Sequence, residues 1–255
     1  MIFNTKLRAF VLYKVSTSLR SEASTYYLSY LWWIVEPILI MLMFYFVFVV
    51  LLRGRSENYN VFLLTGIVPM QWFQKSVSGS MTSITQNKGL ILQVYIDKRV
   101  FPTITVLVDS FKQQFSFLAL FALLFLNGHY VSILWLQLFA LFITQMVWIF
   151  SIAFLVAAVV PLLPDLKFLV SIGLQGMFFV SGVFFSYTEI PVEYQQIFLL
   201  NPMAFLLKSY RDILIEGISV DWHHLGALFL ISLILLFIGS SLIKKLDHQY
   251  PRMLS

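Results

Sequence analysis

Four ionisable side chains stand inside otherwise apolar stretches of this 255-residue sequence, namely Glu36, Lys75, Asp109 and Lys112. A charged group is costly in hydrocarbon, so such residues usually face the protein interior or water and pair with one another. At about 1.5 Å of rise per helical residue, all four fall in the third of the membrane nearest its inner surface. Two acids and two bases at one depth carry no net charge. The pattern predicts a neutralised cluster near the inner mouth of a helix bundle.

The dipeptide Glu36–Pro37 has two interpretations. In one, Pro37 occupies the first turn of a short helix that starts at the membrane surface, and Glu36 favours the positive helix end. In the other, Glu36 belongs to the buried charge cluster, and residues before the proline enter the membrane too, because a helix from Pro37 to Leu52 would span only ~24 Å of a ~30 Å hydrocarbon core. Both interpretations, and a mixture of them, stay open.

A polar stripe is also expected on the second apolar stretch. Gln71, Lys75, Ser78, Thr82 and Thr85 recur at spacings of four, three, four and three, which places them on one helix face. Lipid would not tolerate such a face. It predicts a wet pathway or a seam between subunits, although the second half of the stripe also suits a helix that emerges into the cytoplasm.

Several kinds of chemistry have no residues to perform them in this sequence. There is no cysteine, and the four histidines (His129, His223, His224 and His248) lack the HExxH spacing of a zinc site. GxxxxGK[ST] is missing, so the chain is not expected to hold nucleotide phosphates in the P-loop manner. GxSxG is absent too. We expect no catalytic residue, no metal site and no cofactor bound by this chain.

The composition indicates an integral membrane protein. Hydrophobic residues make up 60% of the chain and charged residues 11%, and the mean hydropathy is +0.86. A helix needs roughly 20 apolar residues to cross the hydrocarbon. Six such stretches predict an all-α protein with one transmembrane domain over residues 1–255: Leu31–Leu52, Tyr59–Gly79, Ile104–Leu126, Ile133–Val159, Phe168–Phe185 and Leu225–Ile243.

Residues 1–30 are predicted to stay on the cytoplasmic side. They contain no long apolar region of a cleaved signal peptide. Phe3, Leu7, Phe10 and Val11 recur at helical spacing among basic residues, which is typical of an amphipathic helix lying on the membrane surface. A basic flank that merely orients the first span explains the pattern equally well.

The distribution of Lys and Arg predicts that both termini are cytoplasmic, because inner loops carry the excess of positive charge. With the N-terminus inside, the outer segments hold only Arg53, Arg55, Lys208 and Arg211. The net charge of +5 then reflects topology and not nucleic-acid binding.

Two connections carry further signals. The inner loop 87–103 mixes apolar and charged positions and is predicted to form a short amphipathic helix ended by Pro102. The outer connection 186–224 is too apolar for a solvated loop. Within it Asn201-Pro202 predicts two short helices that dip back toward the membrane.

Three segments in this order, WWIVEP, GLILQVYIDKRVFP and LLNPMAFLLKSYRDIL, resemble the ABC-2 type permeases. The resemblance covers nearly the whole chain and is closest to the permeases that export bacterial polysaccharides such as O-antigen, capsule and teichoic acid. One departure concerns Leu92 and Gln93, where members of the family often carry basic residues.

The resemblance implies a homodimer that binds two copies of a separate ATPase, on which ATP and Mg are bound. Loop 87–103 would be the element that couples to this ATPase, with Asp97, Lys98 and Arg99 as its contacts. The outer connection would form an external gate, with Asn201, Pro202, Tyr210 and Arg211.

The function implied is export of a lipid-linked polysaccharide, O-antigen or capsule, across the bacterial inner membrane. A drug or lipid permease of the same architecture is the nearer alternative. An ion-coupled transporter fits the sequence less well than either, because midplane acids and repeated broken spans are missing. Sugar rings stack on aromatic side chains, so Tyr45, Trp72 and Phe73 are the candidates to line the pathway.

Overall fold

The computed structural model describes residues 5–25, 31–52 and 58–250. Within these ranges all regular structure is helical and there is no β-strand, which confirms the predicted all-α class. Four helical segments are long and apolar enough to cross a membrane, and they coincide with four of the six predicted spans. They are Trp32–Leu51, Val100–Leu126, Ile133–Val159 and Trp222–Lys245.

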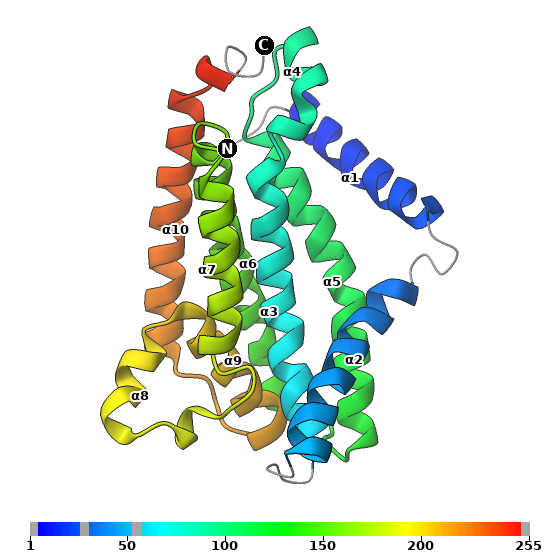
Figure 1. Ribbon diagram of the computed structural model, residues 1–255, viewed down its shortest axis with the longest axis vertical. Coiled ribbons are helices and arrows are strands. Elements are labelled where there is room, and N and C mark those ends of the chain that lie inside the picture. Colours follow the sequence, from blue (N-terminus) through cyan, green and yellow to red (C-terminus); the bar gives the residue numbers. More distant parts are fainter. Residues whose placement is uncertain (1–4, 26–30, 53–57, 251–255) are drawn as a thin grey trace.

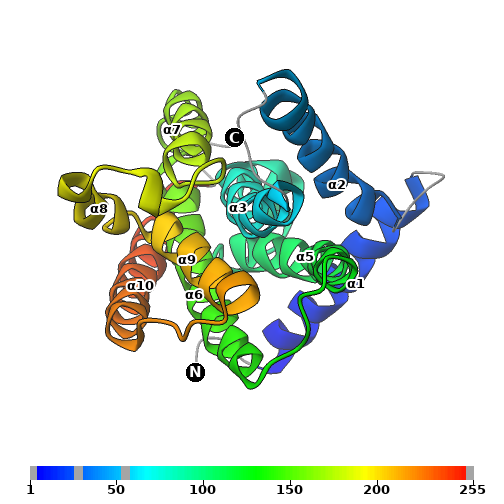
Figure 2. The same ribbon diagram turned by 90° about the horizontal axis from the view of Figure 1, so that it is seen from below.

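The long helices form a bundle in which each one runs opposite to the one before it along the chain (Figure 1). They are α2 (Trp32–Tyr45, continued by the π-helical turn η2, Phe46–Leu51), α3 (Tyr59–Thr82), α5 (Val100–Leu126), α6 (Gln137–Val159, preceded by the 3-10 turn η4, Ile133–Leu136), α7 (Leu166–Val180) and α10 (Trp222–Lys245). Figure 2 shows α3 at the centre, where it contacts α2, α5, α6, α7 and α9 (Pro202–Arg211).

Two predicted spans form helices that are too short or not apolar enough to count among these four. The stretch 59–79 forms α3, most of whose side chains are buried although the helix carries the polar stripe. The stretch 168–185 forms α7, which has 15 residues and ends at Val180. Its length is about 22 Å, short of the ~30 Å hydrocarbon core. The apolar residues after it, Val183 and Phe184, leave the helix and are buried in the core.

The third predicted span starts earlier than expected. Helix α5 begins at Val100, so Pro102 lies inside its first turn and does not end the preceding loop as predicted. A proline is tolerated there because the first N–H groups of a helix have no partner within it. The inner loop helix α4 (Lys88–Gln93) therefore ends well before Pro102.

Helix α1 (Thr5–Thr25) crosses α5 obliquely at the end of the bundle where α4 lies (Figures 1 and 2). Of the residues predicted for its apolar face, Val11 is buried, Leu7 and Phe10 are half-buried, and Phe3 lies outside the described residues. The segment is a helix, as predicted, and it packs on the bundle through one side.

The outer connection forms α8 (Val192–Leu199), α9 and the π-helical turn η6 (Asp212–Glu216), at the end of the bundle opposite α4 (Figure 1). The predicted break is present. Asn201 caps α9 by accepting a hydrogen bond from the Met203 amide at 3.0 Å, and Pro202 takes the first helical position. The Asn201 side chain also donates to Ser181 Oγ at 2.9 Å, which ties the start of α9 to the end of α7.

Arg211 fastens α9 to the segment that follows α7. Its guanidinium donates to the Gly182 carbonyl at 2.6 Å, the Val183 carbonyl at 3.0 Å and the Phe62 carbonyl at 3.2 Å. It also lies 3.5 Å from the centre of the Phe62 ring. Gly66 makes room for it, because a Cβ there would stand 2.6 Å from the guanidinium.

We expect Arg211→Met to lower the free energy of unfolding by about 2–3 kcal/mol, because three carbonyls, two of them buried, lose a charged donor. Thermal unfolding in detergent measures this change. Lys167→Met is the matched control, since Lys167 is an exposed cation on α7 and its removal should leave the melting temperature within about 1 °C. Equal melting temperatures for the two variants would contradict this role of Arg211.

Candidate functional site

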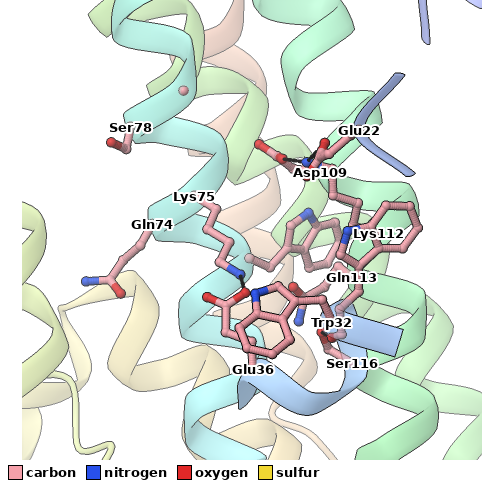
Figure 3. Close-up of a pocket in the computed structure, with 13 residues that line it drawn as sticks. Glu22, Trp32, Glu36, Gln74, Lys75, Ser78, Asp109, Lys112, Gln113 and Ser116 are labelled. Carbon is pink, nitrogen blue, oxygen red and sulfur yellow. Dashed lines mark hydrogen bonds and ion pairs between the residues drawn. The ribbon is translucent and has the colours of Figure 1, made fainter. Parts of the chain in front are cut away.

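A cavity of about 510 Å³ opens between α1, α2, α3 and α5 (Figure 3). We call it the charged cavity. It contains all four ionisable residues singled out in the sequence, together with a fifth from α1. Its lining residues are Glu22, Trp32, Trp33, Glu36, Trp72, Gln74, Lys75, Ser78, Gly79, Asp109, Lys112, Gln113 and Ser116.

The charges in this cavity form two separate groups. Lys75 Nζ lies 2.6 Å from Glu36 Oε2, which joins α3 to α2. Lys112 Nζ lies 2.6 Å from Glu22 Oε2 and 3.5 Å from Asp109 Oδ1, which joins α5 to α1. Three acids face two bases, so the cavity lining carries one formal negative charge. The sequence had predicted a neutral cluster of the four residues without Glu22.

Glu22 is the residue that sequence reasoning missed. It lies in α1, outside every apolar stretch, and nothing in its local sequence marks it as a partner of a residue 90 positions away. Its only signal is that it is the one acid in the described part of residues 1–30.

The structure also decides between the interpretations of Pro37. Helix α2 begins at Trp32, so Pro37 is its sixth residue and the interpretation with Pro37 in the first turn is wrong. A proline inside a helix leaves the carbonyl four residues earlier without its usual donor, and here that carbonyl belongs to Trp33. Ser116 on α5 supplies the missing donor, because its hydroxyl donates to the Trp33 carbonyl at 3.1 Å. A residue of another helix thus donates to the carbonyl to which Pro37 has no N–H to offer.

A second hollow, which we call the polar groove, lies between α2, α3 and α7 and has a volume of about 440 Å³. Glutamine and serine side chains share its lining with aromatic and aliphatic ones. Gln74 and Ser78 border both this groove and the charged cavity. The full lining is Ile40, Met43, Phe44, Gln71, Gln74, Ser78, Ser171, Leu174, Gln175, Phe178 and Phe179.

The polar stripe of α3 thus follows a row of hollows. Gln71 and Ser78 border the polar groove and Lys75 borders the charged cavity. A third hollow, of about 340 Å³ between α1, α3 and α5, is also bordered by Lys75 and reaches Asn87, next to α4. The remaining members, Thr82 and Thr85, donate to carbonyls of their own turn.

The three aromatic residues predicted to line a pathway lie in different surroundings. Trp72 borders the charged cavity and donates to Ser110 Oγ at 3.2 Å. Phe73 is buried and stacks on Trp148, with ring centres 6.5 Å apart. Tyr45 is half-buried and packs against the core at the end of α2. Their lining role stays a prediction.

The residues predicted to contact a partner at the inner loop are occupied within the chain. Arg99 holds Asp97 through its backbone amide and its guanidinium, and it also donates to Ser240 Oγ at 3.3 Å. Burial raises the pKa of the Asp97 carboxyl, but the hydrogen bonds from Arg99 outweigh burial, so the pKa lies below its usual value. Lys98 is turned inward and lies 3.3 Å from Asp247.

The predicted gate residues are all held by hydrogen bonds or packing. Besides the contacts of Asn201, Pro202 and Arg211, the fully buried Tyr210 donates to Gln145 Oε1 at 2.7 Å. Gln145 in turn donates to the Pro69 carbonyl at 2.8 Å, so α9 is joined through α6 to α3.

We expect Ser116→Ala to lower the free energy of unfolding by about 1–2 kcal/mol, since the Trp33 carbonyl loses the hydrogen bond from the Ser116 hydroxyl. In a Pro37→Ala background the same substitution should cost less, because an alanine at that position supplies the helical N–H to the Trp33 carbonyl. Melting in detergent of the two single variants and the double variant measures this coupling. Additive effects would mean that Ser116 does not repair the proline defect.

No protein-family model matches the sequence. The chain is, however, similar over most of its length to several characterised proteins. An O-antigen export system permease protein, RfbA, of Klebsiella pneumoniae is 28% identical over 228 residues, which is 89% of this chain and 88% of that protein. The RfbA permease of Myxococcus xanthus is 26% identical over 95% of this chain and 94% of its own length.

A further relative is named for a different polysaccharide. The polysialic acid transport protein KpsM of Escherichia coli is 26% identical over 231 residues, or 88% of each chain. Over 88% or more of its length this chain is therefore similar to permeases of polysaccharide export systems, which confirms the predicted resemblance to the ABC-2 type exporters.

Proposed function

We propose that this chain is the membrane-spanning subunit of an ATP-driven exporter that moves a lipid-linked polysaccharide, O-antigen or capsule, across the bacterial inner membrane. The observation that carries the proposal is the similarity over about nine-tenths of the chain to permeases named for O-antigen export and for polysialic acid transport. A transport role also fits a sequence without the residues of a catalytic or P-loop site.

In this proposal the chain crosses the membrane six times, with α3 and α7 as the two further crossings and both termini in the cytoplasm. The ends of the described chain support this arrangement, because α1, α4 and the end of α10 lie at one end of the bundle (Figure 1). Basic residues gather there, while Arg53 and Arg55, which were placed outside, lie beyond the described residues.

The polar groove is proposed to be one half of the pathway, completed by a second copy of the chain. The helices on its two sides, α2 and α7, expose apolar side chains that a second copy or lipid would cover. These include Leu39, Leu42 and Met43 on α2 and Phe168, Leu169, Ile172 and Phe179 on α7. A groove with amide and hydroxyl groups beside aromatic rings offers a sugar polymer both hydrogen bonds and stacking surfaces.

Two copies of a separate ATPase are proposed to bind at the inner end, against α4 and the residues around Asp97 and Arg99, and to hold ATP and Mg. The apolar side chains of Leu92, Val94 and Tyr95 are exposed there. At the opposite end, α8 and α9 with Asn201, Pro202, Tyr210 and Arg211 are the proposed external gate.

The first experiment is purification of the tagged chain from its native membranes in a mild detergent. We expect an ATPase subunit at a ratio of one to one, and ATP hydrolysis that rises when a lipid-linked glycan is added. Stimulation by a drug or a lipid alone would identify the alternative permease. A lone oligomer without an ATPase would contradict the exporter and leave ion coupling as the hypothesis to test.

The groove makes its own prediction. Gln71→Leu removes one polar side chain from its lining and should lower the amount of polysaccharide at the cell surface several-fold, with unchanged protein level and ATPase binding. Gln114→Leu is the matched control, because Gln114 is exposed on α5 and borders none of the three hollows. Equal surface polymer in the two variants would remove Gln71 from the pathway.

A further inference from the structure

The Lys98 side chain is turned into the chain itself. Its side chain is only 3% exposed, and Nζ lies 3.3 Å from Asp247 Oδ1 and 4.8 Å from the centre of the Tyr95 ring. Asp247 follows the end of α10 and is itself 9% exposed at its side chain. A charge this deeply buried needs its counter-charge, so the two residues depend on each other for burial.

The segment that carries Asp247 is seated on the bundle by a second contact. Tyr250 is completely buried, and its hydroxyl donates at 3.0 Å to the carbonyl of Ala158 at the end of α6. It packs in a small apolar cluster with Ile91 of α4 and Phe101 of α5. The C-terminal residues Leu246–Tyr250 thus lie between the inner loop and the end of α6.

Helix α10 is in turn held closely against α6. A Cβ at Gly239 would stand 2.9 Å from the Cβ of Phe154, so the two backbones approach each other as only a glycine permits. Motion of α10 must therefore carry α6 with it. From α6 the Gln145–Tyr210 hydrogen bond continues to α9 at the outer end.

Without this contact the inner loop would meet the C-terminal segment through the apolar cluster of Ile91 and Tyr250 and would otherwise be tied to α5, into which the chain continues. Arg99 adds one hydrogen bond to Ser240 of α10, also at 3.3 Å. The buried pair is thus the ion pair that joins the loop to the C-terminal segment, beside the apolar contact of Ile91 with Tyr250.

We propose that Lys98 and Asp247 are positioning residues that fasten the inner loop to the C-terminal segment, so that displacement of the loop by the ATPase moves α10 and α6 together with α5. We call this pair, with Tyr95 and Tyr250, the inner clasp. The role of the clasp in export rests on the proposed function. The clasp itself rests on the geometry alone.

The clasp is tested first without any assay of transport. The chain has no cysteine, so a single Ala158→Cys substitution reports whether Tyr250 covers the end of α6. Lys98→Met should speed maleimide labelling of the introduced cysteine at least about tenfold, because the unpaired Asp247 carboxylate favours the open segment. Lys245→Met, which removes an exposed cation close to Asp247, is the matched control and should leave the rate unchanged.

A double variant, Lys98→Met with Asp247→Leu, separates positioning from partner contact. It leaves no unpaired charge, and apolar replacement of a buried pair is often tolerated, so the labelling rate should return to that of the parent. If labelling is unchanged in Lys98→Met, or is not restored in the double variant, the clasp is wrong.

The role in export is then measured on the complex with its ATPase. Lys98→Met should lower the polymer exported per ATP hydrolysed by about fivefold or more while the ATPase still co-purifies, and the double variant should recover. Loss of the ATPase from both variants would show that Lys98 contacts the partner, which overturns the proposal. If the parent chain itself captures no ATPase, the proposed function fails, and the labelling result decides the clasp independently.

Discussion

Inside hydrocarbon no water can replace a missing hydrogen bond, and this constraint governs the arrangement of the whole bundle. Pro37 leaves the Trp33 carbonyl without a helical donor, and a serine from α5 fills the place. The carbonyls after α7 lie outside regular structure, and Arg211 donates hydrogen bonds to two of them. At both places a residue of another helix supplies the donor, and such contacts help to place the helices relative to one another.

Helix α3 shows how such requirements build the core. Hydrophobic burial gives little preference for one helix neighbour over lipid, so polar contacts and small residues decide which helices associate. The side chains of Gln113 and Gln145 donate to the neighbouring carbonyls of Val68 and Pro69, which holds α5 and α6 against the middle of α3. The polar stripe of α3 borders the hollows, and Gln113 itself lines the charged cavity.

The charged cavity connects the same constraint to the proposed pathway. Glu36 is costly in a membrane helix, yet it faces Lys75 across the cavity and both side chains are partly exposed there. The more enclosed group is that of Lys112, which two carboxylates from different helices share. Because one of them is Glu22, α1 is bound to α5 by charge as well as by packing.

Much of the fold and part of the candidate site could be predicted from single positions and their periodicity. The apolar stretches determined the helical class and four crossing helices, the spacing of Gln71, Lys75 and Ser78 determined a shared polar face, and Asn201-Pro202 determined the break before α9. Periodicity says which residues share a face of a helix, but it does not say which helix that face meets. Only the tertiary structure decided which residues meet: Lys98 pairs with Asp247, Lys112 pairs with Glu22, and Phe73 stacks on Trp148. It also decided that α7 ends at Val180. These outcomes depend on contacts between residues far apart in the chain, where packing and the pairing of buried charges outweigh local preference.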